Sequence, residues 1–140
     1  MEKKKINKIN KMKDALAILA AVVAVAATHI VCEASDVSFS NAYVDSNTYS
    51  YVTSATALQY SSTADVLVTN ILKADGSTSN YKQVYCKATG SGTPVLVTKG
   101  SYYTLTVPIS NRGEGKSIGL YAMGNNPSLD CRISGIWKTH

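Results

Sequence analysis

Residues 35–140 repeat one pattern, in which a short run of alternating apolar and polar residues is followed by a cluster of turn-forming residues. Alternation with a period of two puts the apolar side chains on one face of an extended strand. Turn clusters such as Asp75-Gly76 and Gly124-Asn125-Asn126-Pro127 recur about every ten residues. No apolar stripe with helical spacing appears in this region. The pattern therefore predicts an all-β domain.

We expect about eight short strands, arranged as an antiparallel β-sandwich with a jelly-roll-like topology. The segment 65–72 is almost continuously apolar, so it should lie at the centre of a sheet. In the first strand, Val37, Phe39, Asn41 and Tyr43 should share one face. The strands are expected near residues 37–43, 49–56, 65–72, 81–88, 95–98, 103–109, 118–122 and 129–137.

The first 34 residues have a different composition from the rest of the chain. Six lysines precede an unbroken run of Ala, Leu, Ile and Val over residues 15–27. A basic start and an apolar run shorter than the roughly 20 residues of a membrane span predict a helical secretory signal peptide. Cleavage after Ala34 would leave residues 35–140 as the mature domain. Cleavage after Ala26, lipid attachment to Cys32 and an uncleaved signal anchor are the alternatives.

The leader thus predicts a protein that is secreted and can associate with the cell surface. Its richness in Lys, Asn and Ile is typical of exports from Gram-positive bacteria. Removing it lowers the formal net charge from +5 to +2, because residues 35–140 hold eight basic and six acidic residues. So small a charge argues against a nucleic-acid-binding protein.

The cysteine count also changes when the leader is removed. Cys32 leaves with the leader, and Cys86 and Cys131 remain. Two cysteines in an exported chain predict one disulfide. It would close a loop of 45 residues, which stabilises a fold by roughly 4 kcal/mol in the chain-entropy account. The alternation directs both side chains into the core, and two free buried thiols are the alternative.

Few residues in the mature region are suited to catalysis. His140 is its only histidine, and Ser-His-Asp triads, Cys-His pairs and His-based zinc sites all need a well-positioned imidazole. Glycine-rich phosphate-binding motifs are missing from the sequence. A carboxylate pair for glycoside hydrolysis would have to come from six acids that fall mostly in turns or at strand ends. We therefore expect no enzyme activity, no cofactor and no metal site.

Two short loops allow a functional and a structural interpretation. Asp45-Ser46-Asn47 offers oxygen ligands for calcium, but it lacks the remaining spacing of a calcium loop, so a turn is favoured. Arg112-Gly113-Glu114-Gly115 has the appearance of an adhesive loop, but a glycine-rich hairpin turn explains it fully.

Tyrosine is the residue type in excess, since all nine tyrosines lie in residues 35–140. Tyrosine suits contacts with sugars or proteins because its ring packs while its hydroxyl stays hydrated. Ordinary half-buried strand residues are the alternative interpretation. A possible binding face is formed by Tyr49, Tyr51, Tyr102, Tyr103 and Tyr121.

Three short motifs carry a resemblance to a known family: Tyr102-Tyr103-Thr104-Leu105, Gly119-Leu120-Tyr121-Ala122-Met123-Gly124-Asn125-Asn126 and Ile133-Ser134-Gly135-Ile136-Trp137. In sequence they resemble the ending of small secreted Gram-positive proteins of the domain-of-unknown-function family 2712. That family has no established activity, so the resemblance implies a secreted β domain without catalytic residues. The chain is more distantly similar to lactococcin-972-type bacteriocins, which are also small, exported and rich in Tyr and Gly.

These features together predict a small secreted β-sandwich that binds another molecule and is not an enzyme. A cell-wall glycan or another surface protein is the expected partner. A bacteriocin-like antimicrobial and a carbohydrate-binding module are the two alternative functions.

Overall fold

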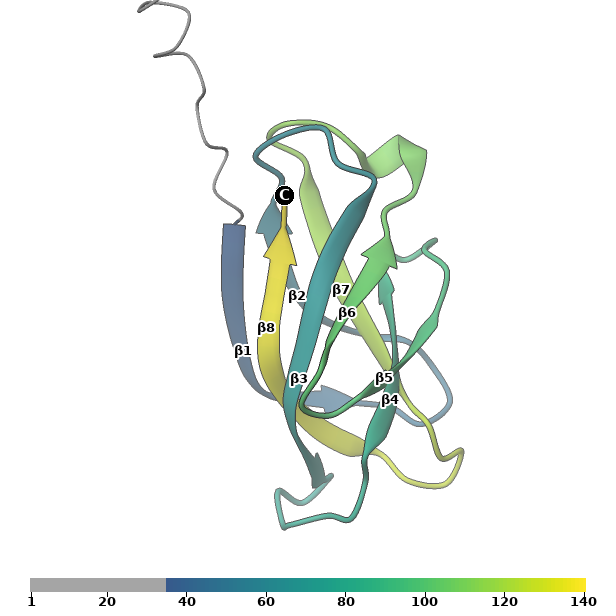
Figure 1. Ribbon diagram of the computed structural model, residues 1–140. Helices are drawn as coiled ribbons and strands as arrows, with labels where there is room; N and C mark the ends of the chain where they lie inside the picture. The colour runs from purple at the N-terminus through teal and green to yellow at the C-terminus, as the bar shows by residue number, and fades with distance from the viewer. Residues whose placement is uncertain (1–34) are drawn as a thin grey trace, which may run out of the picture. The chain divides into compact units, whose positions relative to one another are not determined.

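The computed structural model describes residues 35–140 as a sandwich of two four-stranded antiparallel sheets (Figure 1). The predicted signal peptide, residues 1–34, lies outside the described residues. No helix within residues 35–140 is long and apolar enough to cross a membrane. The elements are β1 (Ser35–Val44), β2 (Ser50–Thr56), β3 (Thr63–Lys73), β4 (Gln83–Ala88), β5 (Val95–Thr98), β6 (Tyr102–Thr106), the 3-10 turn η1 (Ile109–Asn111), β7 (Ser117–Gly124) and β8 (Cys131–Thr139).

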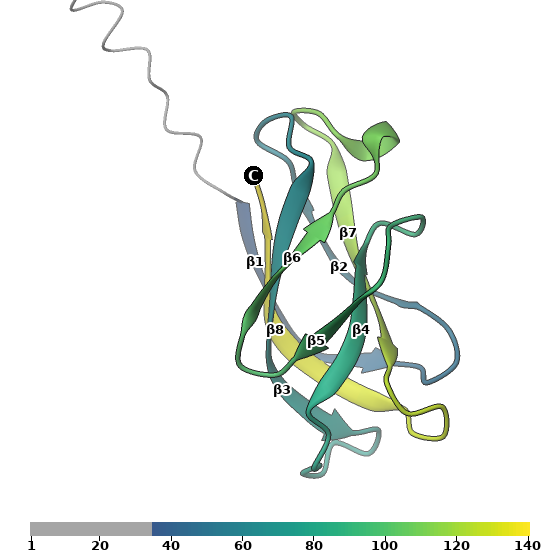
Figure 2. The same ribbon diagram turned by 45° about the vertical axis from the view of Figure 1, so that its right-hand side comes forward.

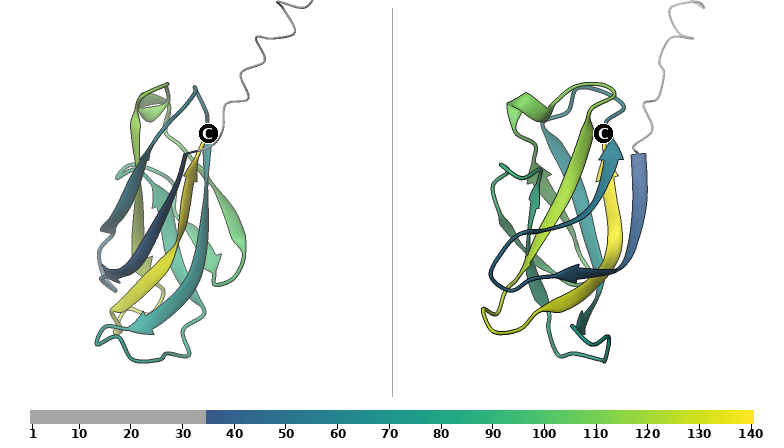
Figure 3. Two further views of the ribbon diagram at one scale, coloured as in Figure 1. Left: turned by 90° about the vertical axis from the view of Figure 1, so that its left-hand side faces the viewer. Right: turned by 180° about the vertical axis from the view of Figure 1, so that it is seen from behind.

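The strand order confirms the predicted all-β sandwich. Sheet A has the order β1-β8-β3-β6, and sheet B has the order β2-β7-β4-β5. The first strand pairs with the last, the second with the seventh, the third with the sixth and the fourth with the fifth. The chain is therefore one long antiparallel ribbon wrapped around itself, which is the jelly-roll arrangement. Figure 2 and Figure 3 let the reader follow the crossings from sheet to sheet.

The core lies between the two sheets. As the sequence predicted, the apolar segment in β3 is central, since β3 is flanked by β8 and β6. Trp137 of β8 is fully buried, and its indole Nε1 donates a hydrogen bond to the carbonyl oxygen of Ile118 in β7, 2.9 Å away. Because β8 and β7 belong to different sheets, this bond joins the two layers while it satisfies a buried donor.

The predicted inner face of the first strand is wrong beyond Phe39. Asn41 has a φ of 57°, and the pairing of β1 with β8 shifts between Phe39 and Ala42. This β-bulge moves the alternation by one residue, so Tyr43 is exposed and Val44 is fully buried. The Asn41 backbone N–H donates to the Ser134 hydroxyl oxygen at 3.0 Å, which anchors the bulge on β8.

Two strand ends also differ from the prediction. Ile109 lies in η1 and is 75% exposed, because the strand ends at Thr106 before Pro108, which has no N–H to continue the ladder. Leu129 lies in the loop before β8 and is 40% exposed. Each residue continued an apolar alternation in the sequence, and alternation alone does not mark where a ladder stops.

The predicted disulfide is absent from the structure, in which Cys86 and Cys131 are both free and buried. Alternation did place each thiol on the inner face of its sheet, Cys86 in β4 and Cys131 in β8. A disulfide also needs Cα atoms roughly 4.4–6.8 Å apart and Cβ atoms that point toward each other, which alternation does not determine. An inward position on each sheet is therefore not sufficient for a bond. Burial raises the pKa of Cys86 to about 12 and the pKa of Cys131 to about 11.

Candidate functional site

The outer face of sheet B carries a group of large side chains. In β4, Val84 and Cys86 point into the core, so Gln83, Tyr85 and Lys87 lie on the opposite, outer face. The strand thus presents an amide, an aromatic ring and an amine in a row. The outer face of sheet B is therefore a candidate binding surface.

The neighbouring strands add rings to the same face. Tyr121 of β7 pairs with Tyr51 of β2 on one side and with Lys87 of β4 on the other. The rings of Tyr51 and Tyr121 meet edge to face, with their centroids 5.6 Å apart and their planes at 72°. Met123 of β7 pairs with Tyr85 and is half-buried. We call the surface formed by Tyr49, Tyr51, Tyr85, Lys87 and Tyr121 the tyrosine face.

Lys87 is the one charged residue in the four strands of sheet B. Its Nζ lies over the ring of Tyr49, 4.2 Å from the centroid, and donates a hydrogen bond to the Gly90 carbonyl oxygen. Burial raises the pKa of the Tyr49 hydroxyl. The cation is therefore already engaged by a ring and a carbonyl, and the hydroxyl stays protonated at neutral pH. The tyrosine face offers rings and neutral hydrogen-bonding groups.

A shallow hollow interrupts the face beside the ring pair. Gly119 of β7 lies under the edges of both rings, since a Cβ atom at this position would lie 3.0 Å from Tyr121 Cε2 and 3.5 Å from Tyr51 Cε2. The Tyr51 hydroxyl hydrogen-bonds the Ser54 hydroxyl at 3.1 Å. The hollow has a volume of about 240 Å³ and is lined by Tyr51, Ser54, Thr89, Gly90, Asn111, Ser117, Gly119 and Tyr121.

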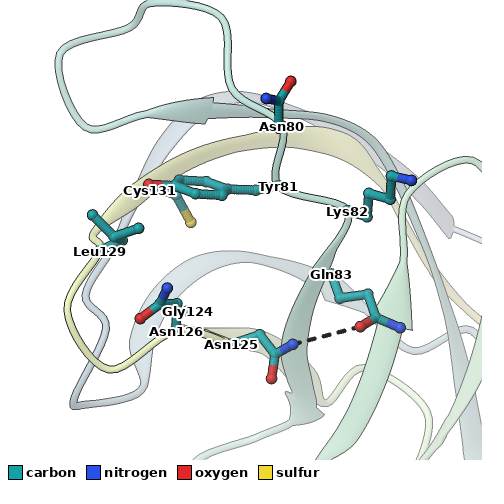
Figure 4. A pocket seen from close by; sticks show the side chains of 9 residues that line it. All are labelled: Asn80, Tyr81, Lys82, Gln83, Gly124, Asn125, Asn126, Leu129 and Cys131. Atoms are coloured by element: carbon teal, nitrogen blue, oxygen red, sulfur yellow. Dashed lines mark hydrogen bonds between the residues drawn. The ribbon is translucent and has the colours of Figure 1, made fainter.

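A second concavity, the end pocket, lies where β4 begins and β7 ends (Figure 4). Gln83 Nε2 donates to Thr98 Oγ1 at 3.1 Å, and Asn125 Nδ2 donates to Gln83 Oε1 at 3.5 Å. Because Gln83 lies on the outer face of β4, these hydrogen-bonded side chains lie next to Tyr85, at one end of the tyrosine face. The end pocket has a volume of about 270 Å³ and is lined by Asn80, Tyr81, Lys82, Gln83, Gly124, Asn125, Asn126, Leu129 and Cys131.

The structure brings together three of the five predicted tyrosines. Tyr49, Tyr51 and Tyr121 share the tyrosine face, whereas Tyr102 and Tyr103 belong to β6 of sheet A. Tyr102 is exposed on that sheet, and Tyr103 packs against the core. The prediction of a single face with all five is wrong, because alternation gives the side of a strand but not the sheet to which the strand belongs.

Sequence reasoning missed Tyr85, Gly119 and the residues of the end pocket. A signal for Tyr85 was present, since the alternation in β4 sets it opposite the inward Cys86. No local signal marks Gly119, whose role depends on two rings from different strands. The end pocket combines the entry to β4 with the loop that precedes β8, which are more than 40 residues apart in the chain.

The terminal histidine is better held than the sequence suggests. His140 Nε2 lies 3.1 Å from Asp65 Oδ2, and the Thr104 hydroxyl donates to Asp65 Oδ1 at 2.7 Å. Within residues 35–140, no serine hydroxyl or cysteine thiol hydrogen-bonds the imidazole. The pair therefore lacks the nucleophile that a triad needs.

The turn interpretation of the Asp45 loop fits the geometry. Asp45 Oδ1 accepts hydrogen bonds from the backbone N–H groups of Asn47 at 2.6 Å and Thr48 at 3.1 Å. This is an Asx turn, which uses the carboxylate oxygen that a cation would need. In the part of the chain that the structure describes, no group of three or more His, Cys, Asp or Glu residues is placed to hold a metal ion.

No family model, no curated protein and no solved structure matches the chain. The similarity of the C-terminal half to the domain-of-unknown-function family 2712 therefore stays a prediction. What the molecule itself defines is an all-β jelly-roll sandwich with a tyrosine face on sheet B and a pocket beside it.

Proposed function

We propose that the protein is exported, is not an enzyme, and binds a neutral glycan at the cell surface through the tyrosine face of sheet B. The observation that carries the proposal is the paired rings of Tyr51 and Tyr121, which line the shallow hollow on this face. A sugar ring presents apolar C–H groups on its faces and hydroxyl groups around its rim. Exposed aromatic rings next to neutral hydroxyl and amide groups complement both kinds of surface.

The charge of the surface favours a neutral ligand. The strands of sheet B contain no carboxylate, and their one cation already contacts the Tyr49 ring. A phosphorylated or acidic polymer would require unpaired lysines or arginines on this face. Tyrosine also suits contact with a protein partner. The binding experiment below distinguishes a protein partner from a glycan.

The leader supports the location that we propose. Its lysines and the apolar run over residues 15–27 have the layout of a secretory signal. The mass of the secreted protein tests this step: we expect a chain that starts at Ser35, and a mass that includes residues 1–34 would contradict cleavage.

Binding to purified cell-wall glycan tests the proposed surface. We expect the double variant Tyr51→Ala/Tyr121→Ala to lose most of its retention on insoluble glycan, because both stacking rings are removed. Tyr102→Ala is the matched control, since Tyr102 is 58% exposed and Tyr51 is 57% exposed, but Tyr102 lies on sheet A. Equal retention of all variants and the wild type would contradict the proposal, and so would retention only on glycan that still carries protein.

A further inference from the structure

The end pocket is one of three neighbouring concavities that share a single lining residue, Tyr81. Tyr81 lines the end pocket and two neighbouring concavities of about 540 and 500 Å³. The Tyr81 side chain is half-buried and packs against the core. In Figure 4 its ring lies across the pocket beside the Cys131 sulfur. A ring fixed in this way offers a rigid apolar surface to a ligand.

The polar groups of the end pocket are neutral and partly unused. Asn125 uses its Nδ2 for Gln83 and has no partner for its Oδ1 within the described residues. Asn126 accepts a bond from the Ser128 N–H at its Oδ1, while its Nδ2 has no partner in the same part of the chain. Both residues are exposed, so a free acceptor and a free donor lie at separate points on the rim of the pocket. The hydroxyl groups around a sugar ring, each of which can donate and accept, can satisfy groups of both kinds.

The lining of the end pocket contains no carboxylate and one cation. That cation is Lys82, which is exposed, and Figure 4 shows its side chain pointing away from the Tyr81 ring. A charged ligand would therefore find no counter-ion at the centre of the pocket. The Leu129 side chain and the buried Cys131 thiol supply apolar contact on the remaining sides.

We infer that the end pocket binds a single neutral sugar ring, with Tyr81 against one face of the ring and Gln83, Asn125 and Asn126 around its hydroxyl groups. Its volume of about 270 Å³ lies just below the roughly 300–1,000 Å³ of pockets that enclose drug-sized ligands. The space therefore suits one ring and not a chain. This inference rests on the proposed glycan function and deepens it, because it assigns the end of a glycan to a defined subsite.

The position of the end pocket explains how it would act with the tyrosine face. The pocket begins at Gln83 and Asn125, directly beyond the paired residues Tyr85 and Met123. A glycan whose last ring occupies the pocket can extend over the tyrosine face. The end pocket would then recognise the terminal sugar of the glycan, while the tyrosine face makes less specific contacts with the sugars that precede it.

Titration of the ¹⁵N-labelled protein with glucose, galactose, mannose and N-acetylglucosamine tests the inference. We expect at least one of these sugars to cause saturable shifts of the Gln83, Asn125 and Asn126 side-chain amide signals and of the Tyr81 backbone signal. Inorganic phosphate is the anion probe, and we expect it to cause none of these shifts. Shifts with phosphate alone, or no shift with any of the four sugars, would overturn the inference.

Three variants separate the pocket from general surface effects. Asn125→Ala removes the free acceptor and should weaken binding about 3- to 10-fold, the effect of one lost hydrogen bond. Leu129→Trp should fill the pocket and abolish the shifts. Asn70→Ala removes an exposed amide from sheet A and should leave the affinity unchanged. All three positions are exposed, so an unchanged core spectrum verifies the fold.

The outcomes for the end pocket and for the tyrosine face are distinguishable. Suppose that Asn125→Ala weakens monosaccharide binding and Leu129→Trp abolishes it, while Tyr51→Ala/Tyr121→Ala leaves glycan retention unchanged. That result would keep the pocket and remove the proposed surface. Glycan retention that depends on Tyr51 and Tyr121, without any monosaccharide shift, would keep the proposed function and remove the pocket.

Discussion

Asp130 shows how a single side chain joins distant parts of this chain. Its Oδ1 accepts a hydrogen bond from the Ser46 backbone N–H at 2.9 Å, and its Oδ2 accepts one from the Tyr43 hydroxyl. The loop before β8 is thereby tied to the end of β1 and the turn that follows it. The two hydrogen bonds hold the pKa of Asp130 below its usual range, with the Tyr43 bond as the larger cause. The carboxylate in turn raises the pKa of Tyr43.

The lowered pKa of Asp130 predicts a pH dependence of stability. A carboxyl group with a lowered pKa in the folded state stabilises the fold above its unfolded pKa of about 3.9, and this contribution is lost as the pH falls through the folded pKa. The wild type should therefore be more stable than Asp130→Asn near neutral pH, and the difference should shrink in acid. Urea unfolding of both proteins across the acid range measures the difference. A difference that stays constant would contradict the assignment.

The comparison with Asp130→Asn is needed because Asp75 titrates in the same range. Hydrogen bonds from the Ser77 side chain and backbone hold the pKa of Asp75 below its usual value. The wild type and Asp130→Asn share this contribution, so it cancels in their difference.

The two buried thiols predict slow reaction with alkylating reagents. Burial raises the pKa values of Cys86 and Cys131 to about 12 and 11, so little thiolate is present at neutral pH. We expect no labelling of either residue in the native protein, and labelling of both after unfolding without a reductant. Counting labelled thiols by mass checks this expectation. An unfolded chain that is labelled only after reduction would show that the two residues are bridged.

At the scale of the elements, β8 is a central strand of sheet A and supplies the largest side chain of the core. It lies between β1 and β3 and contributes Trp137 to the core. Gly135 lies at its middle, opposite Phe39 of β1 and Val68 of β3. A Cβ atom at Gly135 would lie 2.0 Å from the Leu67 carbonyl oxygen and 2.8 Å from Phe39 Cζ. The glycine therefore permits the close approach of β3 and the packing of the Phe39 ring.

The crowding at Gly135 predicts a large loss of stability for Gly135→Ala. The added methyl group would have to move the backbone of β3, so we expect a loss of about 3 kcal/mol or more in the free energy of unfolding. Gly90→Ala is the control, because a Cβ there meets nothing within 4 Å and the backbone is not left-handed. Denaturant unfolding compares the two. Equal stabilities of these variants would show that β3 and β8 are not so closely packed.

At the scale of the whole molecule, the sequence predicts the strands well and their partners poorly. All eight predicted strands are present, because alternation and turn residues are local signals. The pairing of β1 with β8 joins the two ends of the described region, and no local sequence pattern predicts this pairing. The same limit explains why Tyr102 was grouped with Tyr51, although they lie on different sheets. The end pocket escaped prediction because it forms only when two distant loops meet.

The tyrosine face is the central functional claim, and mapping it by NMR tests that claim most directly. The ¹⁵N-labelled protein would be titrated with soluble cell-wall glycan fragments. We predict shifts at Tyr49, Tyr51, Tyr85 and Tyr121 on sheet B and none at Tyr102 on sheet A. Shifts centred on Tyr102 and the outer face of sheet A, or no shift with any fragment, would contradict the account.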